Sequence, residues 1–126
     1  MDKKIIQTDN APAPIGPYNQ AIAANGMLFI SGQIPLDPAT GDLVSGSIEA
    51  EAEQVMKNLE AILSEAGVSF SHVVKTTIFL TDMSLFAQVN GVYGKYFDEA
   101  APARETVEVA GLPKGVNVEI SMIAIK

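Results

Sequence analysis

The feature that most constrains the fold is a nearly unbroken apolar segment at residues 116–125, which reads VNVEISMIAI. Most of its residues are β-branched or otherwise favourable in strands. An apolar run of this kind is typical of a strand that is covered on both of its faces. The remaining chain, or a partner subunit, is therefore expected to cover this strand from two sides.

Several strands are predicted upstream of this segment. Ile5-Ile6 predicts a short first strand, and residues 73–80 predict a longer one. Asn25-Gly26 lies between two apolar runs, and this predicts a β-hairpin because both central turn residues must adopt positive φ. A further strand is predicted after Pro102, where β-branched residues alternate with polar ones.

Two helices are predicted between these strands. Ser47 is expected to cap the first helix and Gly67 to end it, with an apolar stripe at helical spacing: Ile48, Ala52, Val55, Met56, Leu59, Ile62, Leu63 and Ala66. Asp82 or Ser84 is expected to cap a second helix over residues 85–97, which two glycines weaken. The pattern predicts one α+β domain over residues 1–126, with both helices on one face of a single sheet.

The composition predicts that other subunits cover the second face of this sheet. Hydrophobic residues make up 48% of the 126 residues, charged residues 18%, and the mean hydropathy is +0.22. These values are apolar for a chain of this size. Formation of a dimer or trimer is the simplest way to cover the face that the helices leave open.

The composition also excludes or disfavours several classes of function. The chain has no Cys, which excludes disulfides, thiol nucleophiles and cysteine-containing zinc sites. Its single histidine, His72, lies between a helix end and a strand, so a surface or turn role is favoured over a catalytic triad. A net charge of −7 disfavours nucleic acid as a partner. Without a signal-peptide pattern or a membrane-length apolar run, we expect a cytoplasmic protein with no membrane partner.

One cation dominates the functional interpretation. Arg104 lies at the start of an alternating segment, in a chain with 8 Lys and Arg against 15 Asp and Glu. A guanidinium is a planar fork of donors that can hold a carboxylate through two parallel hydrogen bonds. The alternative for Arg104 is a surface salt bridge to one of the many acids.

Six spaced motifs, in order along the chain, resemble the RidA/YjgF family of reactive-intermediate deaminases; they lie at residues 10–18, 31–35, 74–80, 86–93, 102–114 and 118–120. The resemblance implies a chorismate-mutase-like α+β fold with the last strand inside a single mixed sheet. It also implies a homotrimer with clefts between subunits. The implied reaction is hydrolysis of 2-imino acids or their enamine tautomers, such as 2-iminobutanoate and 2-iminopropanoate, to 2-keto acids and ammonia. An imine carbon is already electrophilic, so this chemistry needs no cofactor and no metal.

The resemblance also implies roles for individual residues. Arg104 would hold the substrate carboxylate, and Glu119 would activate the attacking water and then help move a proton to the leaving nitrogen. Glu119 interrupts an apolar run, so its carboxylate is expected to be paired or to border a cleft. Its alternative is a structural partner for a backbone group or a cation.

Three further positions complete the expected substrate site. Tyr18 follows the stiff Ile15-Gly16-Pro17 loop and would wall the pocket or offer its hydroxyl, although packing at an interface is the alternative. Ser31 and Gly32 end a hairpin strand, where glycine would let the backbone approach a ligand closely and a plain bend is the alternative. Thr106 lies two residues after Arg104 and therefore on the same strand face, at a position where many relatives carry Cys.

Two other functions compete with the deaminase. A non-catalytic module that binds or senses small 2-keto acids would need the arginine but not the glutamate. A nuclease is disfavoured by the net charge and by the absence of a basic stripe and of a histidine pair.

Overall fold

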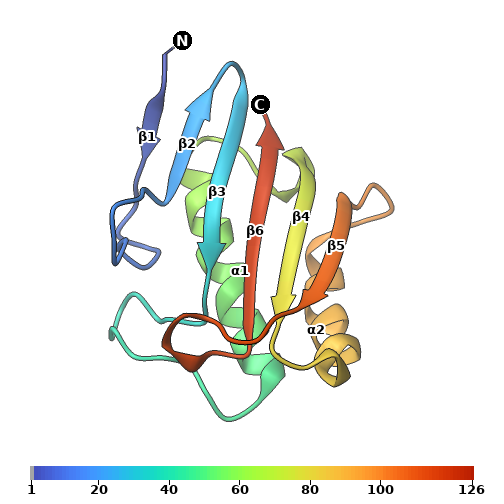
Figure 1. Cartoon of the computed structure of the whole chain (residues 1–126). Coiled ribbons are helices and arrows are strands. Elements are labelled where there is room, and N and C mark those ends of the chain that lie inside the picture. Colours follow the sequence, from blue (N-terminus) through green and yellow to red (C-terminus); the bar gives the residue numbers. More distant parts are fainter. Residues whose placement is uncertain (1) are drawn as a thin grey trace.

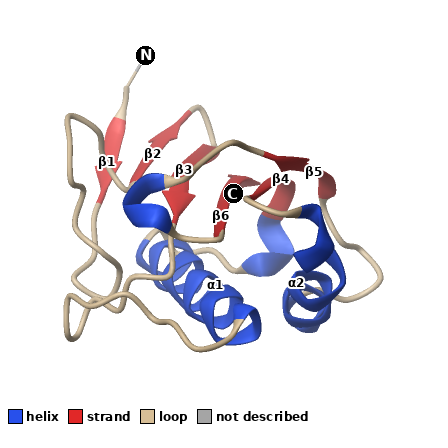
Figure 2. Ribbon diagram, turned by 60° about the horizontal axis from the view of Figure 1, so that its bottom comes forward, coloured by secondary structure: helices blue, strands red, loops and turns tan. Residues whose placement is uncertain are grey.

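The computed structural model describes residues 2–126 and contains one six-stranded mixed sheet in the order β1-β2-β3-β6-β4-β5 (Figure 1). Its strands are β1 (Lys4–Ile6), β2 (Ala21–Ala24), β3 (Met27–Gln33), β4 (Val73–Leu80), β5 (Ala103–Glu108) and β6 (Val118–Ile125). Two α-helices, α1 (Ile48–Glu65) and α2 (Phe86–Tyr93), pack on the same face of the sheet (Figure 2). The prediction of an α+β fold with both helices on one face is confirmed.

The crossover connections explain why both helices lie on one side. β3 and β4 run in the same direction, joined by α1, and the gap between them is filled by β6, which is antiparallel to both. β4 and β5 are adjacent parallel strands joined by α2. Both crossovers move in the same direction along the sheet, and right-handed crossovers that do so place their helices on the same face.

Local signals predicted the first helix and the hairpin correctly. The Ser47 side chain caps α1 by accepting a hydrogen bond from the Ala50 N–H at 3.0 Å, and Gly67 follows the helix at φ +78°. The apolar stripe of α1 forms the centre of the core, with Val55, Met56, Leu59 and Ile62 fully buried. The hairpin turn has positive φ at both Asn25 (53°) and Gly26 (76°), as its residues require.

The prediction of one continuous helix over residues 85–97 is wrong. Asp82 caps a 3₁₀ turn at Met83–Leu85, which leads into α2 at Phe86. The α-helix ends at Tyr93, and a second 3₁₀ turn covers Gly94–Tyr96. The apolar spacing continues through these turns, but Gly94 has a low helix propensity and the α-helix ends before it.

Within the single chain β6 is covered on one face, and the expectation that a partner subunit covers its other face stays a prediction. Alternate residues Val118, Ile120, Met122 and Ala124 are buried against the helices, whereas the intervening ones are only partly buried or exposed. We call this second side of the sheet the open face. The expectation that β6 lies inside the sheet is confirmed, because it pairs with both β3 and β4.

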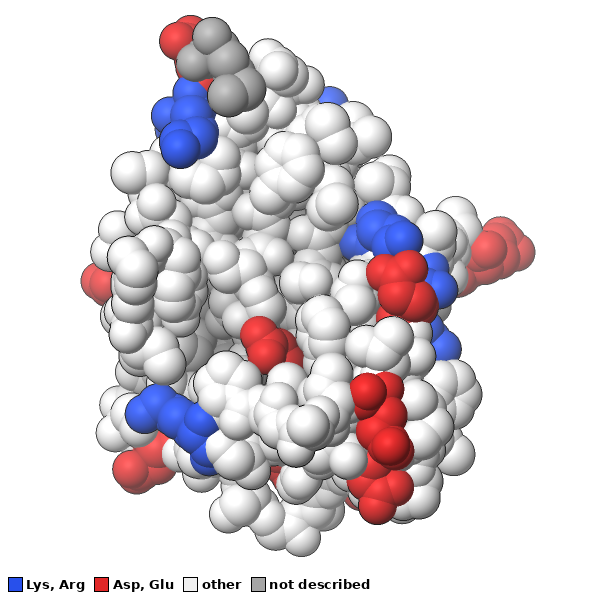
Figure 3. Space-filling view, in the orientation of Figure 1, with Lys and Arg blue, Asp and Glu red and all other residues white. Residues whose placement is uncertain are grey.

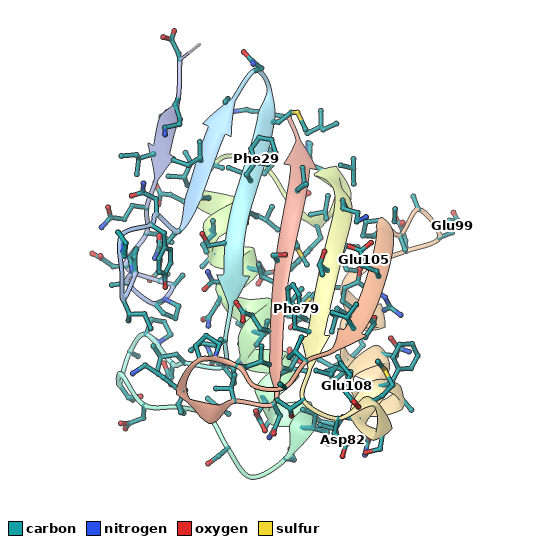
Figure 4. The ribbon with its side chains drawn as sticks, viewed as in Figure 1. Phe29, Phe79, Asp82, Glu99, Glu105 and Glu108 are labelled. Carbon is teal, nitrogen blue, oxygen red and sulfur yellow. The ribbon has the colours of Figure 1, made fainter. Side chains whose placement is uncertain are left out.

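The open face carries a row of apolar side chains that crosses four strands. In the strand register, Ile5 pairs with Ile22, Ile22 with Phe29, and Phe29 with Ile123. Phe29 is 43% exposed, and Phe79 of β4 lies on the same face (Figure 4). Figure 3 shows that charged side chains gather mainly at the margins of this face. A large apolar surface of this kind marks an interaction site.

Two smaller observations concern the exclusions made above. His72 belongs to a 3₁₀ turn, where its Nδ1 accepts a hydrogen bond from the Ser69 N–H at 3.2 Å, so its assignment to a turn is confirmed. Between residues 2 and 126, no helix is both long enough and apolar enough to cross a membrane.

Candidate functional site

A pocket on the open face brings four of the predicted residues together. Its volume is about 330 Å³, and we call it the open-face pocket. Its lining comes from the proline-rich loop, the end of β3, the loop before β6, and β6 itself: Ile15, Tyr18, Ser31, Gly32, Ile34, Pro113 and Glu119. A larger cavity of about 510 Å³ between α1 and the N-terminal loop contains none of the predicted residues.

Glu119 contributes the one carboxylate among the residues that line the open-face pocket. It lies between buried Val118 and Ile120, so strand alternation turns its side chain to the open face, where its register partner is Phe79. Within residues 2–126 the carboxylate forms no ion pair and no side-chain hydrogen bond. Burial raises the pKa of Glu119 above the ordinary carboxyl value of 4.5. An unpaired and partly dehydrated carboxylate that borders a cleft is suited to accept a proton.

The backbone at Gly32 makes room for this carboxylate. A β-bulge sets Ser31 and Gly32 of β3 opposite Ser121 of β6. A Cβ atom at Gly32 would lie 2.1 Å from Oε2 of Glu119 and 2.8 Å from its Cδ. The space that glycine leaves open is therefore occupied by the Glu119 side chain, where the sequence suggested close approach of a ligand.

Tyr18 is held at the pocket rim by its own loop. Its hydroxyl accepts a hydrogen bond from the Ile15 N–H at 3.3 Å, and its backbone N–H donates to the Gly16 carbonyl at 2.8 Å. The buried Gln20 amide ties this loop down by donating to the carbonyls of Thr8, Ala11 and Pro12. Because the Tyr18 hydroxyl accepts within the loop, its own proton remains available to donate.

The hydroxyl of Ser31 already donates its proton within the chain. Its Oγ donates to the carbonyl oxygen of Asn19 at 2.6 Å, and a carbonyl can only accept. Ser31 therefore has no proton left for a substrate carboxylate, but its oxygen can accept a hydrogen bond from an N–H group or a water molecule. This chemistry fits the nitrogen end of a protonated imine better than the acid end.

Arg104 lies on the other side of the sheet. It is on the edge strand β5 and pairs in register with Thr76, which is fully buried under the helices. Its Cζ atom is 5.0 Å from the ring centroid of Tyr93 and 5.5 Å from that of Phe86. No carboxylate of residues 2–126 forms an ion pair with the guanidinium, since the salt bridge of this region joins Lys75 to Glu105. The alternative of a surface salt bridge is thus not observed among these residues.

One chain cannot place Arg104 and Glu119 on the same small molecule. They project from opposite faces, with β4 between their strands, so they are separated by two strand spacings, roughly 10 Å. Along the strand direction their register partners on β4, Thr76 and Phe79, are three residues apart, which is a further offset of roughly 10 Å at right angles to the first. The predicted site residues therefore form two separate half-sites.

Thr106 shares the helix-facing side of β5 with Arg104, as strand alternation predicts. Its Oγ1 is buried and has no hydrogen-bond partner among the described residues. A buried hydroxyl without a partner costs free energy. The hydroxyl of Thr106 is therefore expected to lower the stability of the isolated chain.

The sequence interpretation missed the two aromatic contacts of Arg104. Both rings lie within the motif at residues 86–93, but that motif did not connect them with the arginine. Phe86 and Tyr93 are seven residues apart, which is a helical spacing that puts both rings on one side of α2. The sequence therefore indicated that the two rings share one helix face. It could not indicate that this face lies beside Arg104, because that depends on how α2 packs against β5. Among the described residues, no cluster of three or more His, Cys, Asp or Glu could hold a metal ion.

Similarity to a solved structure identifies the structural class of the chain. The crystal structure of TdcF from E. coli with bound serine matches with a TM-score of 0.92 and 44% sequence identity, over 98% of this chain and 98% of that chain. The chain is thus a small α+β protein of the type that builds one mixed sheet with two helices on one face.

The family follows from the sequence comparisons. The family model described as Endoribonuclease L-PSP matches residues 8–126, and the chain belongs to this family, the RidA/YjgF family expected from its motifs. A RutC family protein of Synechocystis is 61% identical over 99% of this chain and 98% of its own length. The 2-iminobutanoate/2-iminopropanoate deaminase of Mus musculus is 49% identical over 98% of this chain and 92% of its own length.

Proposed function

We propose that the protein hydrolyses 2-imino acids, such as 2-iminobutanoate and 2-iminopropanoate, to 2-keto acids and ammonia. The observation that carries the proposal is the Glu119 carboxylate, which lies unpaired among the described residues in the open-face pocket with a raised pKa. The mouse relative with this activity in its name is 49% identical over nearly the whole chain, which supports the same reaction class.

We further propose that each active site is shared by two copies in a homotrimer. Arg104 and Glu119 lie too far apart within one chain, and Arg104 is on an edge strand from which it can reach a neighbour. The apolar row across the open face supplies a surface that association would bury. A cyclic assembly would bring the Arg104 half-site of one copy to the open-face pocket of the next.

The proposed mechanism assigns binding and proton transfer to different half-sites. The guanidinium of Arg104 holds the substrate carboxylate, and the Ser31 oxygen accepts a hydrogen bond from the protonated imine nitrogen. Water attacks the C=N carbon while Glu119 takes one of its protons, and the π-electron pair moves to nitrogen. In this mechanism the Tyr18 hydroxyl, which lines the same pocket, donates a hydrogen bond to this water or to the substrate carboxylate.

The second step returns the proton. Glu119 transfers it to the amino group of the carbinolamine, the C–N bond breaks as the C=O bond forms, and the hydroxyl proton passes to the departing ammonia, which leaves as ammonium. One water molecule is consumed, and Glu119 ends in its ionised form. A base whose pKa is raised toward the working pH is well suited to both transfers.

A mixing experiment tests both the reaction and the shared site. The imino acids are generated in situ from an amino acid and an amino acid oxidase, and release of the 2-keto acid is followed. We expect folded Arg104→Ala and Glu119→Gln each to keep a measurable residual activity of about 1% or less of the wild type. A 1:1 co-assembly should regain about a quarter of the wild-type activity, because half of the copies supply each group. An inactive mixture beside an active wild type would contradict the shared site, and full activity of Arg104→Ala would contradict the assignment of the binding residue.

The alternative function is a non-catalytic module that binds small 2-keto or amino acids. The bound serine of E. coli TdcF, a protein of the same fold, favours this alternative. Such a module needs Arg104 but has no use for an unpaired Glu119. Binding of 2-ketobutyrate without any acceleration of imine hydrolysis would support it.

A further inference from the structure

The Arg104 guanidinium lies on a shelf of two aromatic rings, which we call the aromatic shelf and define as Phe86 and Tyr93. The ring centroids are 5.5 Å and 5.0 Å from Cζ, within the distance at which a cation is attracted by the face of a ring. This attraction uses none of the five N–H donors of the guanidinium. All of them therefore remain available for an acid.

The two rings differ in how firmly they are held. Phe86 is 36% exposed at the start of α2, whereas Tyr93 is 5% exposed at its end. Tyr93 also packs against Phe97, with 4.8 Å between the ring centroids. Of the two rings of the aromatic shelf, Tyr93 is thus the fixed one.

A buried hydrogen bond fixes the orientation of Tyr93. Its hydroxyl lies 2.8 Å from Oγ1 of Thr76, and both residues are buried. Burial raises the pKa of Tyr93, so the phenol keeps its proton at neutral pH. Thr76 is also the register partner of Arg104 in the adjacent parallel strand. The Tyr93 hydroxyl is therefore hydrogen-bonded to the residue that lies directly beside Arg104 in the sheet.

We infer that Tyr93 is a positioning residue that holds the Arg104 guanidinium ready for a carboxylate, with Thr76 fixing its ring. This inference rests on the proposed function of Arg104 as the carboxylate-binding group. A free arginine side chain has several rotatable bonds, and ordering them on binding weakens the affinity for the ligand. The aromatic shelf orders the side chain before the ligand arrives, so it should affect ligand affinity more than turnover.

The functional test measures the dissociation constant of 2-ketobutyrate by calorimetry, together with kcat and KM for imine hydrolysis. Tyr93→Leu should raise the dissociation constant and KM about tenfold and change kcat less than twofold. Tyr93→Phe keeps the ring but loses its hydrogen bond to Thr76, so, like Thr76→Val, it should weaken affinity by about threefold, which is less than the effect of Tyr93→Leu. In the Arg104→Ala background, Tyr93→Leu should cause no further loss of turnover.

Tyr96→Leu is the matched control. Tyr96 belongs to the same aromatic cluster, through Phe70, and its hydroxyl is bonded to Glu53, but it makes no cation–π contact with Arg104. This exchange should lower the melting temperature while leaving the 2-ketobutyrate affinity unchanged. If Tyr93→Leu does not fold, Thr76→Val replaces it, because it releases the ring without removing it.

A second readout does not depend on activity. Arg104 is the single arginine of the chain, so its Nε–H resonance is assigned without ambiguity. Ring currents should shift this resonance upfield in the wild type, and the shift should shrink in Tyr93→Leu or Thr76→Val. An unshifted resonance, or ligand affinity that Tyr93→Leu leaves intact, would overturn the positioning role. A shifted resonance in a protein that neither binds 2-ketobutyrate nor hydrolyses imines would overturn the proposed function and leave the aromatic shelf standing.

Discussion

Replacing Gly32 by alanine is expected to move the Glu119 carboxylate while leaving the chain folded. The added Cβ would lie 2.1 Å, 2.8 Å and 2.9 Å from Oε2, Cδ and Cγ of Glu119. All three atoms belong to a flexible side chain, which can turn away by changing its rotamer. The steric conflict should therefore be relieved by displacement of the proposed catalytic group.

The size of both effects follows from this geometry. Oε2 must retreat by about 1 Å or more to reach an ordinary contact distance. A misplacement of that size in a reacting group costs about 100-fold in rate, so kcat/KM for imine hydrolysis should fall by about two orders of magnitude. Gly32 does not have a positive φ, so alanine is accepted by the backbone and stability should change by less than about 1 kcal/mol.

The assay pairs imine hydrolysis with urea unfolding for each variant. Gly91→Ala is the matched control, because a Cβ at Gly91 meets no atom within 4 Å. It lies within α2, where alanine should add about 0.5–1 kcal/mol of stability, and activity should not change. Gly32→Ala combined with Glu119→Gln should be no less active than Glu119→Gln alone, because both changes remove the same function.

Two results would refute this reasoning. One is a Gly32→Ala protein whose kcat/KM stays within twofold of the wild type. The other is a further loss of activity when Gly32→Ala is added to Glu119→Gln, since the alanine would then act through something other than the carboxylate.

Three further predictions address the charge, the buried hydroxyl and the family description. Because burial raises the pKa of Glu119, kcat/KM should fall as the pH drops through a value above 4.5. For the same reason the ionised carboxylate destabilises the fold at pH 7, so Glu119→Gln should raise the melting temperature at pH 7 but not at pH 4. Equal gains in melting temperature at both pH values would contradict this. Thr106→Val removes a buried unpartnered hydroxyl and should add about 1 kcal/mol to the free energy of unfolding in urea, whereas a loss of stability would reveal a hidden partner. The net charge of −7 predicts no salt-dependent RNA binding in a filter assay at 50–200 mM salt, and a steep salt dependence would revive the nuclease.

The elements that the sequence predicted well are those that depend on neighbouring residues. The Asn25-Gly26 turn, the Ser47 cap and the Gly67 end of α1 are each set by the conformation of one or two residues. The second helix was predicted too long because apolar spacing persists through 3₁₀ turns, where it has the same appearance as in an α-helix.

The sequence indicated candidate site residues but could not predict how they are arranged in space. Alternation within β5 correctly placed Thr106 on the face of Arg104, since both belong to one strand. The relation of Arg104 to Glu119 depends on the register of β5 with β4 and of β4 with β6, and no local pattern encodes it. The close fit of Glu119 over Gly32 likewise depends on a bulge between strands that are far apart in sequence.

The central position of β6 has a consequence for how the protein is made. A ribosome that has synthesised residues 1–108 has produced five strands and both helices, yet β3 and β4 still lack the neighbour that joins them. Such a nascent chain exposes two unpaired strand edges, which invite association with other chains. Insertion of the last strand removes both edges and delivers Glu119 in the same event. Completion of the fold and arrival of the proposed base are therefore one step, and shortened chains that lack this strand should be neither stable nor active.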